Sequence, residues 1–191
     1  GKIGGEVALE SLVAQLGGTH SEAAEKALLA FNGDICTGVQ KALEGEKEIQ
    51  LTALRIAQTR SIEETADKVF AMLDSEDAAI SNAAYQTLAG VVEPTHFDRL
   101  STLLEKGKQV PAIQKAMKSA ILSLSKEEQT AKIQASMSKS GNPSLYYPVL
   151  AQVGNAQAIA EIRKGYDGKY KQAAYEALLA IDNKDMIPVL F

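Results

Sequence analysis

The sequence predicts an all-α protein built as a stack of about six two-helix repeats, running as a single array over residues 1–191. Three observations support this fold class. Ala and Leu dominate the apolar residues, which make up 46% of the chain, while aromatic residues are only 5% and Trp is absent. Such a composition favours closely packed helices over sheets. A nine-residue segment recurs along the chain, and a second amphipathic stretch lies between its copies.

The recurring segment aligns without gaps in six copies whose starts are 28, 32, 33, 29 and 28 residues apart. Its sixth position is always a large aliphatic residue, and its seventh is always Ala or Leu. Positions 2, 6 and 9 are separated by four and three residues, which places them on one face of a helix. We therefore predict helices near 23–31, 51–59, 83–91, 116–124, 145–153 and 173–181.

A second helix is predicted between successive segments. The sets Ile35/Val39/Leu43 and Phe97/Leu100/Leu103/Leu104 have the spacing of one buried helical stripe. Every repeat then reads as helix, turn, helix. Residues 4–16 add one further predicted helix before the first complete copy.

Local patterns predict where some helices begin. Ser61 with Glu64, and Ser125 with Glu128, have the spacing of a capping box. Pro148 lies inside the fifth segment, and Pro is tolerated only in the first turn of a helix. We therefore expect that helix to begin near Tyr147.

The repeat resembles HEAT-type or armadillo-like repeats. The resemblance consists of the thirty-residue helix pair, the small and aliphatic second helix, and the polar turn after it, carried by 32–34, Asn155 and 183–185. It covers about residues 20–191, although the Arg common in the second helix of many HEAT repeats is missing in most copies. It implies an α-α superhelix, or solenoid, of the bacterial HEAT-like type, in which each helix pair is stabilised by stacking on its neighbours.

The resemblance implies a non-catalytic protein–protein interaction or scaffolding module that presents a concave helical groove. The alternative is an accessory domain of a larger multidomain bacterial enzyme, for example a carbohydrate-active one, whose catalytic domain lies outside this chain. Both ends of the sequence look cut, so we expect an excised piece of a longer protein with Leu190 and Phe191 at an exposed end. The suspected fusion favours an exported location, periplasmic or in the cell envelope, over the cytoplasm.

A row of tyrosines marks the candidate groove. If the segment forms the inner helix of each pair, its positions 3, 4 and 8 border the concave surface, and Tyr is favoured at binding surfaces. In that case the position 3 side chains should be exposed. The alternative is that the tyrosines fill gaps between adjacent repeats, with only the hydroxyl in water. The candidate groove residues are Tyr85, Gln86, Lys118, Tyr147, Gln152, Tyr175 and Glu176.

The sequence contains no recognisable catalytic, cofactor or metal site. His20 and His96 lie far apart in different repeats, so we expect surface or capping roles, because a metal would need converging ligands. Cys36 has no His near it in sequence, and we expect a small buried hydrophobe there. The paired carboxylates lie at predicted helix starts, where they complement the helix dipole.

The net charge and the distribution of charged residues indicate which kinds of partner the chain can bind. The chain has 20 basic and 24 acidic residues spread along its length, a net charge of −4. It lacks the concentrated basic stripe that a phosphate backbone requires, which argues against nucleic acid. No apolar run approaches the roughly 20 residues needed to cross a bilayer. The expected partners are a protein, a peptide or other domains of the same chain.

Overall fold

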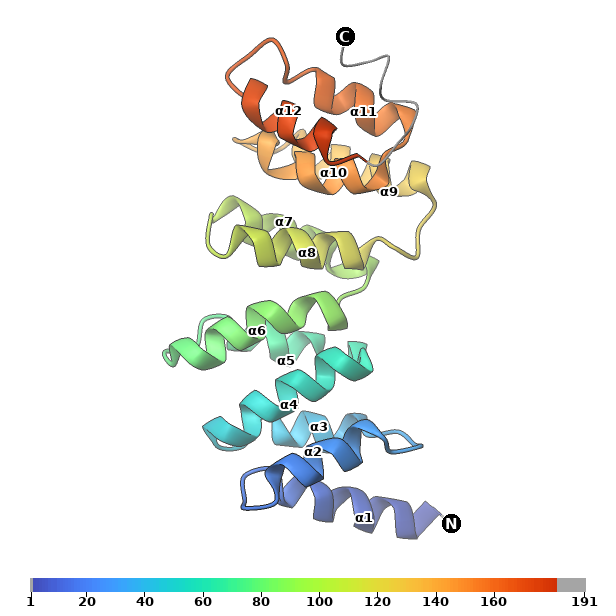
Figure 1. Ribbon diagram of the computed structural model, residues 1–191, viewed down its shortest axis with the longest axis vertical. Helices are drawn as coiled ribbons and strands as arrows, with labels where there is room; N and C mark the ends of the chain where they lie inside the picture. Colours follow the sequence, from blue (N-terminus) through green and yellow to red (C-terminus); the bar gives the residue numbers. More distant parts are fainter. Residues whose placement is uncertain (1, 182–191) are drawn as a thin grey trace. The chain divides into compact units, whose positions relative to one another are not determined.

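The computed structural model describes residues 2–181, with side chains from residue 7 onward, and over this range it is helical without a strand (Figure 1). The prediction of an all-α protein is confirmed. The chain divides into two compact units, Gly1–Val92 and Glu93–Phe191. The turn predicted at 183–185 and the expected exposed end at Leu190 and Phe191 lie outside the described residues.

In the first unit the helices pack in consecutive pairs. Within the pairs, α1 contacts α2, α3 contacts α4 and α5 contacts α6; between the pairs, α2 contacts α4 and α4 contacts α6. The helix predicted over residues 4–16 is confirmed as α1. The elements are α1 (Lys2–Ala14), α2 (Ser21–Leu29), α3 (Cys36–Ala42), α4 (Lys47–Arg60), the short 3-10 helix η1 (Glu63–Thr65), α5 (Ala66–Met72) and α6 (Ala78–Val91).

The second unit follows the same scheme. Here α7 contacts α8, α9 contacts α10 and α11 contacts α12, while α10 also contacts both α8 and α12. The elements are η2 (Pro94–His96), α7 (Phe97–Glu105), α8 (Val110–Ala120), α9 (Lys126–Met137), η3 (Pro143–Tyr146), α10 (Tyr147–Val153), α11 (Ala156–Arg163) and α12 (Lys171–Leu179).

The six recurring segments lie on the second helix of each pair: α2, α4, α6, α8, α10 and α12, which we call the motif helices. The segment at 116–124 runs past the end of α8, and the segment at 145–153 begins in η3. Positions 2 and 6 are buried in all six copies, and position 9 is less uniform because Thr59 is exposed. The residues at position 6 are Leu28, Ile56, Leu88, Ile121, Leu150 and Leu178.

One of the two predicted capping boxes is confirmed. The Glu128 N–H donates to Ser125 Oγ at 3.3 Å, and the Ser125 N–H donates to Glu128 Oε2 at 2.9 Å. The prediction of a capping box at Ser61 is wrong. This residue is the C-cap of α4, and its backbone is in the left-handed region with φ 50°. Helix α10 begins at Tyr147, as the position of Pro148 predicted.

A close backbone approach joins α4 to α6 at Gly90. A Cβ on this residue would lie 2.6 Å from the carbonyl oxygen of Gln58 and 2.8 Å from its Cα. Both distances are far below van der Waals contact, so only glycine allows the two motif helices to pack this closely.

Candidate functional site

The predicted tyrosine row is divided between core and surface. Tyr85 is 6% exposed and Tyr147 is 3% exposed, so the expectation that these two side chains lie on the surface was wrong. Tyr175 is 41% exposed. Of the other candidate groove residues, Gln86, Gln152 and Glu176 are exposed and Lys118 is half-buried.

Tyr147 is buried because its side chain reaches the adjacent helix pair, α11 and α12. A Cβ on Gly165, which follows α11, would clash with the Tyr147 hydroxyl and ring. Burial raises the pKa of Tyr147, and the nearby Tyr170 and Glu161 add to this rise. The glycine therefore leaves space for the ring, and the gap-filling alternative describes this tyrosine correctly.

The first unit shows what position 3 faces. Glu25 holds this position in α2, and its carboxylate accepts two hydrogen bonds from Arg55 of α4, at 2.8 Å and 3.0 Å. Position 3 of one motif helix is thus directed toward the next motif helix. Tyr175 lies on α12, the last helix of the described chain, which accounts for its exposure.

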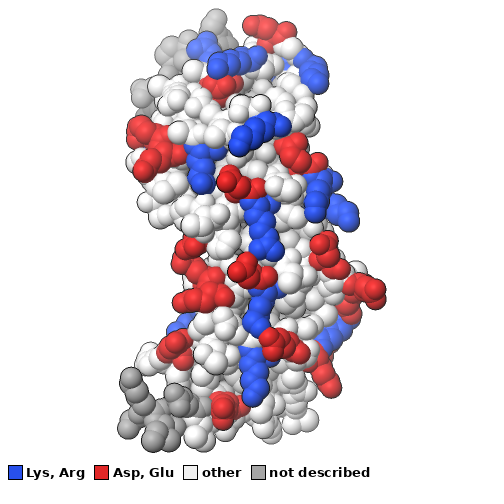
Figure 2. Space-filling view, turned by 180° about the vertical axis from the view of Figure 1, so that it is seen from behind, with Lys and Arg blue, Asp and Glu red and all other residues white. Residues whose placement is uncertain are grey.

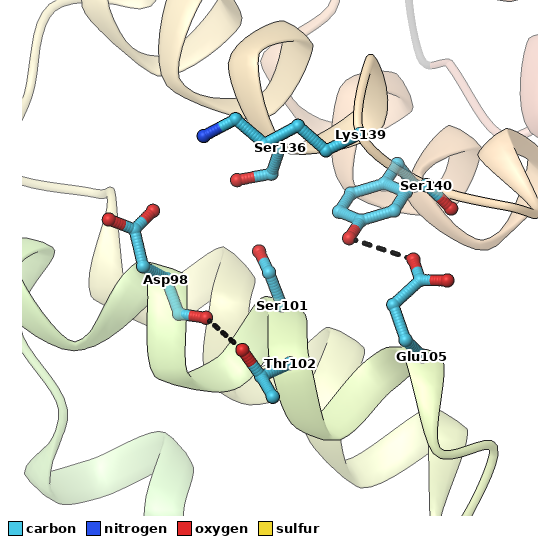
Figure 3. A pocket seen from close by; sticks show the side chains of 8 residues that line it. Asp98, Ser101, Thr102, Glu105, Ser136, Lys139 and Ser140 are labelled. Atoms are coloured by element: carbon cyan, nitrogen blue, oxygen red, sulfur yellow. Dashed lines mark hydrogen bonds between the residues drawn. The ribbon is translucent and has the colours of Figure 1, made fainter.

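A polar pocket lies in the second unit, between α7 on one side and the end of α9 with η3 on the other (Figure 3). It has a volume of about 280 Å³. None of the sequence-predicted site residues lines it. The lining residues are Asp98, Ser101, Thr102, Glu105, Ser136, Lys139, Ser140 and Tyr146.

One face of α7 forms the first wall. Its four lining residues, at 98, 101, 102 and 105, have the i, i+3, i+4, i+7 spacing of a single helical stripe. On the same helix, Phe97, Leu100 and Leu104 are fully buried. The helix is therefore fixed by its apolar residues while its polar stripe faces the pocket.

Tyr146, in η3, also lines the pocket. Its side chain is buried, and its hydroxyl donates to Glu105 Oε1 at 3.1 Å. Burial raises the pKa of Tyr146 to about 12, and the Glu105 carboxylate contributes to this rise, whereas the neighbouring Ser101 hydroxyl opposes it. The phenol therefore stays protonated near neutral pH and acts as a donor to Glu105.

Ser101 is the exceptional group in the pocket. The residue is 8% exposed, and its Oγ has no hydrogen-bond partner of acceptable geometry within residues 7–181. Figure 3 shows this hydroxyl directed into the space between the two walls. A buried hydroxyl without a partner is rare in folded proteins and calls for a water or a ligand.

The second wall carries Ser136, Lys139 and Ser140. Ser136 is buried, whereas Lys139 is exposed, and no described acidic side chain forms an ion pair with its ammonium group. The lining thus combines two carboxylates and one ammonium, a formal charge of −1, with hydroxyl groups between them.

The two histidines and the cysteine lie outside this pocket. His96 Nδ1 accepts a hydrogen bond from the Glu93 N–H at 3.2 Å, which is the expected capping role. His20 precedes α2 and is exposed, without a side-chain capping bond. Cys36 is half-exposed rather than buried, because it opens α3 beside a turn. Burial and the carboxylates of Glu64 and Asp34 raise the pKa of its thiol.

Over the described range, no cluster of three or more His, Cys, Asp or Glu side chains could hold a metal ion. No helix in that range is both long and apolar enough to cross a membrane. Figure 2 shows one face of the protein, on which basic side chains are interspersed with acidic ones in each unit. Charged side chains also pair between helices, as Lys47 does with Asp77 at 2.7 Å.

Comparisons with family models, curated proteins and solved structures found no match to this chain.

Proposed function

We propose that the chain is a non-catalytic binding module, an α-α superhelix of HEAT-like helix pairs whose motif helices present a surface to a protein or peptide. The observation that carries this proposal is the recurrence of one burial pattern. Positions 2 and 6 are buried in all six motif helices, and consecutive motif helices contact each other within each unit. Helix pairs that stack in this way keep one edge of each helix free for binding.

In the second unit, the exposed candidates lie on neighbouring motif helices. Gln152 is on α10, Tyr175 and Glu176 are on α12, and α10 contacts α12. Leu179, one turn after Tyr175, is 55% exposed. An exposed Tyr and Leu flanked by polar side chains have the composition of a protein-binding surface. Tyr85 and Tyr147 are not part of this surface because they are buried.

Selection of peptides from a displayed library on the purified chain tests the proposal. Peptides that bind wild-type protein should bind Tyr175→Ala about tenfold or more weakly, since truncating a central interface tyrosine has effects of that order. Gln157→Ala, at an exposed position on α11, is the control and should bind normally. No selected peptide, or a Tyr175→Ala effect confined to a lower melting temperature, would contradict the proposal.

The alternative role, as an accessory domain of a larger enzyme, has no specific observation among the described residues in its favour.

A further inference from the structure

We infer that the polar pocket of the second unit binds a cationic side chain of a peptide or protein partner, with the guanidinium group of arginine as the best fit. This inference rests on the proposed function, because it assigns a subsite to the binding module. It adds the chemical class of the group that is recognised and the residues that recognise it.

Ser101 is the first argument for a ligand. The serine is more than nine-tenths buried, and its hydroxyl points into the pocket. Its Oγ makes no hydrogen bond of good geometry within residues 7–181, although the Tyr146 hydroxyl is a polar neighbour. Leaving a buried hydroxyl unpaired is destabilising. A polar group that enters the pocket would remove this penalty, whereas an apolar group would not.

The acceptors on α7 are the second argument. Glu105 Oε1 is held by the Tyr146 hydroxyl, which leaves the other carboxylate oxygen of Glu105 for a ligand. Asp98 lies on the same face two turns earlier, about 10 Å away along the helix axis. Ser101 and Glu105 are one turn apart on this face, so a hydroxyl and a carboxylate can both accept from one planar guanidinium with five N–H donors, while Asp98 adds a second negative charge at the far end of the pocket.

Size and surroundings argue against larger or neutral ligands. A volume of about 280 Å³ lies at the lower limit of small-molecule pockets, so it suits one side chain better than a folded segment. The Tyr146 ring is buried and offers no open face for stacking. Recognition must therefore come from charge and hydrogen bonds.

Lys139 provides a test of the charge of the ligand. Its ammonium is at the pocket but exposed on a flexible stem, and it should repel a cation. Replacing Lys139 should therefore strengthen binding of a guanidinium, while replacing Glu105 should weaken it. A pocket built for an anion would respond in the opposite way to both changes.

The experiment is a titration of the full chain with Nα-acetyl-argininamide, followed by amide chemical shifts. The neutral citrulline analogue is the matched ligand. We expect shifts centred on residues 98–105 and 136–146, and about tenfold weaker binding of the citrulline analogue, because charged hydrogen bonds are the stronger ones. Glu105→Gln should also bind about tenfold more weakly, Lys139→Gln more tightly, and Glu127→Gln, an exposed control at the start of α9, like wild type.

Ser101→Ala separates a binding role from a packing role. Because it removes an unpaired group, this change should leave the melting temperature equal or higher while it weakens binding of Nα-acetyl-argininamide. Unchanged binding by Ser101→Ala would overturn the assignment of this hydroxyl. Equal binding of the two ligands, an absence of shifts, or weaker binding by Lys139→Gln would overturn the cationic pocket.

Failure of this inference and failure of the proposed function give different results. Library peptides that bind wild type and Glu105→Gln equally would refute the pocket and leave the binding module intact. Binding of Nα-acetyl-argininamide without any selected peptide would leave the pocket intact and refute the module.

Discussion

Tyr146 is buried in η3 with its hydroxyl bonded to Glu105 of α7, and its ionisation is coupled to folding. Its pKa is raised to about 12, first by burial and then by the Glu105 carboxylate, whereas a tyrosine in the unfolded chain ionises near pH 10. Above about pH 10 the unfolded state therefore loses this proton while the folded state retains it. The contribution of Tyr146 is fully present below pH 10 and is lost as the pH rises toward 12.

We predict that the free energy of unfolding falls more steeply between about pH 10 and pH 12 in wild type than in Tyr146→Phe. Urea unfolding at a series of pH values measures the difference. Burial also raises the pKa of Tyr85 and Tyr147, so tyrosinate absorbance of the folded protein should show one fewer late-titrating hydroxyl in Tyr146→Phe than in wild type. Lysine deprotonation affects both proteins equally, so it cancels in the comparison. Equal slopes would mean that the phenol is not protected from ionisation.

Arg60 closes the end of the preceding motif helix. Its guanidinium donates to the carbonyl oxygens of Leu29 at 3.0 Å and Phe31 at 2.9 Å, and to that of Leu28 at 3.3 Å. These carbonyls lie at the C-terminus of α2, where a positive charge also complements the helix dipole. One side chain of α4 thus satisfies several acceptors of its neighbour.

We predict that Arg60→Met lowers the free energy of unfolding by about 1.5–3 kcal/mol, the range for hydrogen bonds to charged groups. Arg60→Lys should fall between this variant and wild type, since the charge remains but the fork of donors is lost. Arg163→Met is the control, because Arg163 is exposed in the last turn of α11, and it should stay within about 0.5 kcal/mol. A similar loss in both Met variants would contradict the capping role.

For single residues, the sequence predicted which motif positions face the core. It did not predict whether the side chain at position 3 is buried or exposed. Tyr146, Leu150 and Val153, at positions 2, 6 and 9, share one helix face by spacing alone, and all three are buried. Tyr147 is next to that face, and its burial depends on the room left by Gly165. The sequence of a single helix does not contain that information, because the covering residue comes from the next pair.

Between elements, the backbones of α4 and α6 approach each other closely at Gly90. We predict that Gly90→Ala lowers the free energy of unfolding by about 1–3 kcal/mol, as overpacking of a close interface does. The added methyl group meets the backbone of Gln58, which cannot turn aside as a flexible side chain could. Thermal and urea unfolding measure the effect.

Gly168→Ala is the matched control for Gly90→Ala. Nothing lies within 4 Å of a Cβ on Gly168, so this variant should be neutral or slightly stabilised through the unfolded state. Equal behaviour of the two variants would show that α4 and α6 separate without loss of stability.

The two predicted capping boxes show that a local sequence pattern alone does not determine where a helix begins. Ser61 and Ser125 are each followed three residues later by Glu, yet only Ser125 caps a helix. Helix α4 extends to Arg60 and so makes Ser61 its end, a result that depends on packing along the whole helix. The pocket is likewise only partly predictable from local sequence. The polar stripe on α7 follows from helical spacing, whereas Ser136 and Tyr146 line the opposite side of the pocket and lie more than thirty residues away in the sequence.

For the molecule as a whole, the pairwise packing in the first unit predicts how stability spreads along the chain. Ile56 is fully buried in α4, which contacts α2 on one side and α6 on the other. Ile56→Ala should lower the free energy of unfolding by about 2–5 kcal/mol, the range for truncating a buried Ile or Leu to Ala. If the chain is the repeat array proposed above, its helix pairs are coupled mainly to their neighbours. The loss of amide protection should then be largest in α4 and extend to α2 and α6.

Native-state hydrogen exchange measures this spread helix by helix. The comparison variant is Leu28→Ala, at the same motif position in α2 and also fully buried. It should reduce protection in α2 and, less strongly, in α4, and leave α6 close to its wild-type value. If either substitution reduced protection equally in every helix of the first unit, that unit would unfold as one cooperative domain, and the description by neighbouring repeats would be wrong. A graded response that follows the order of the motif helices would instead mean that each helix pair owes its stability to the pairs packed against it, which is the property a repeat array requires.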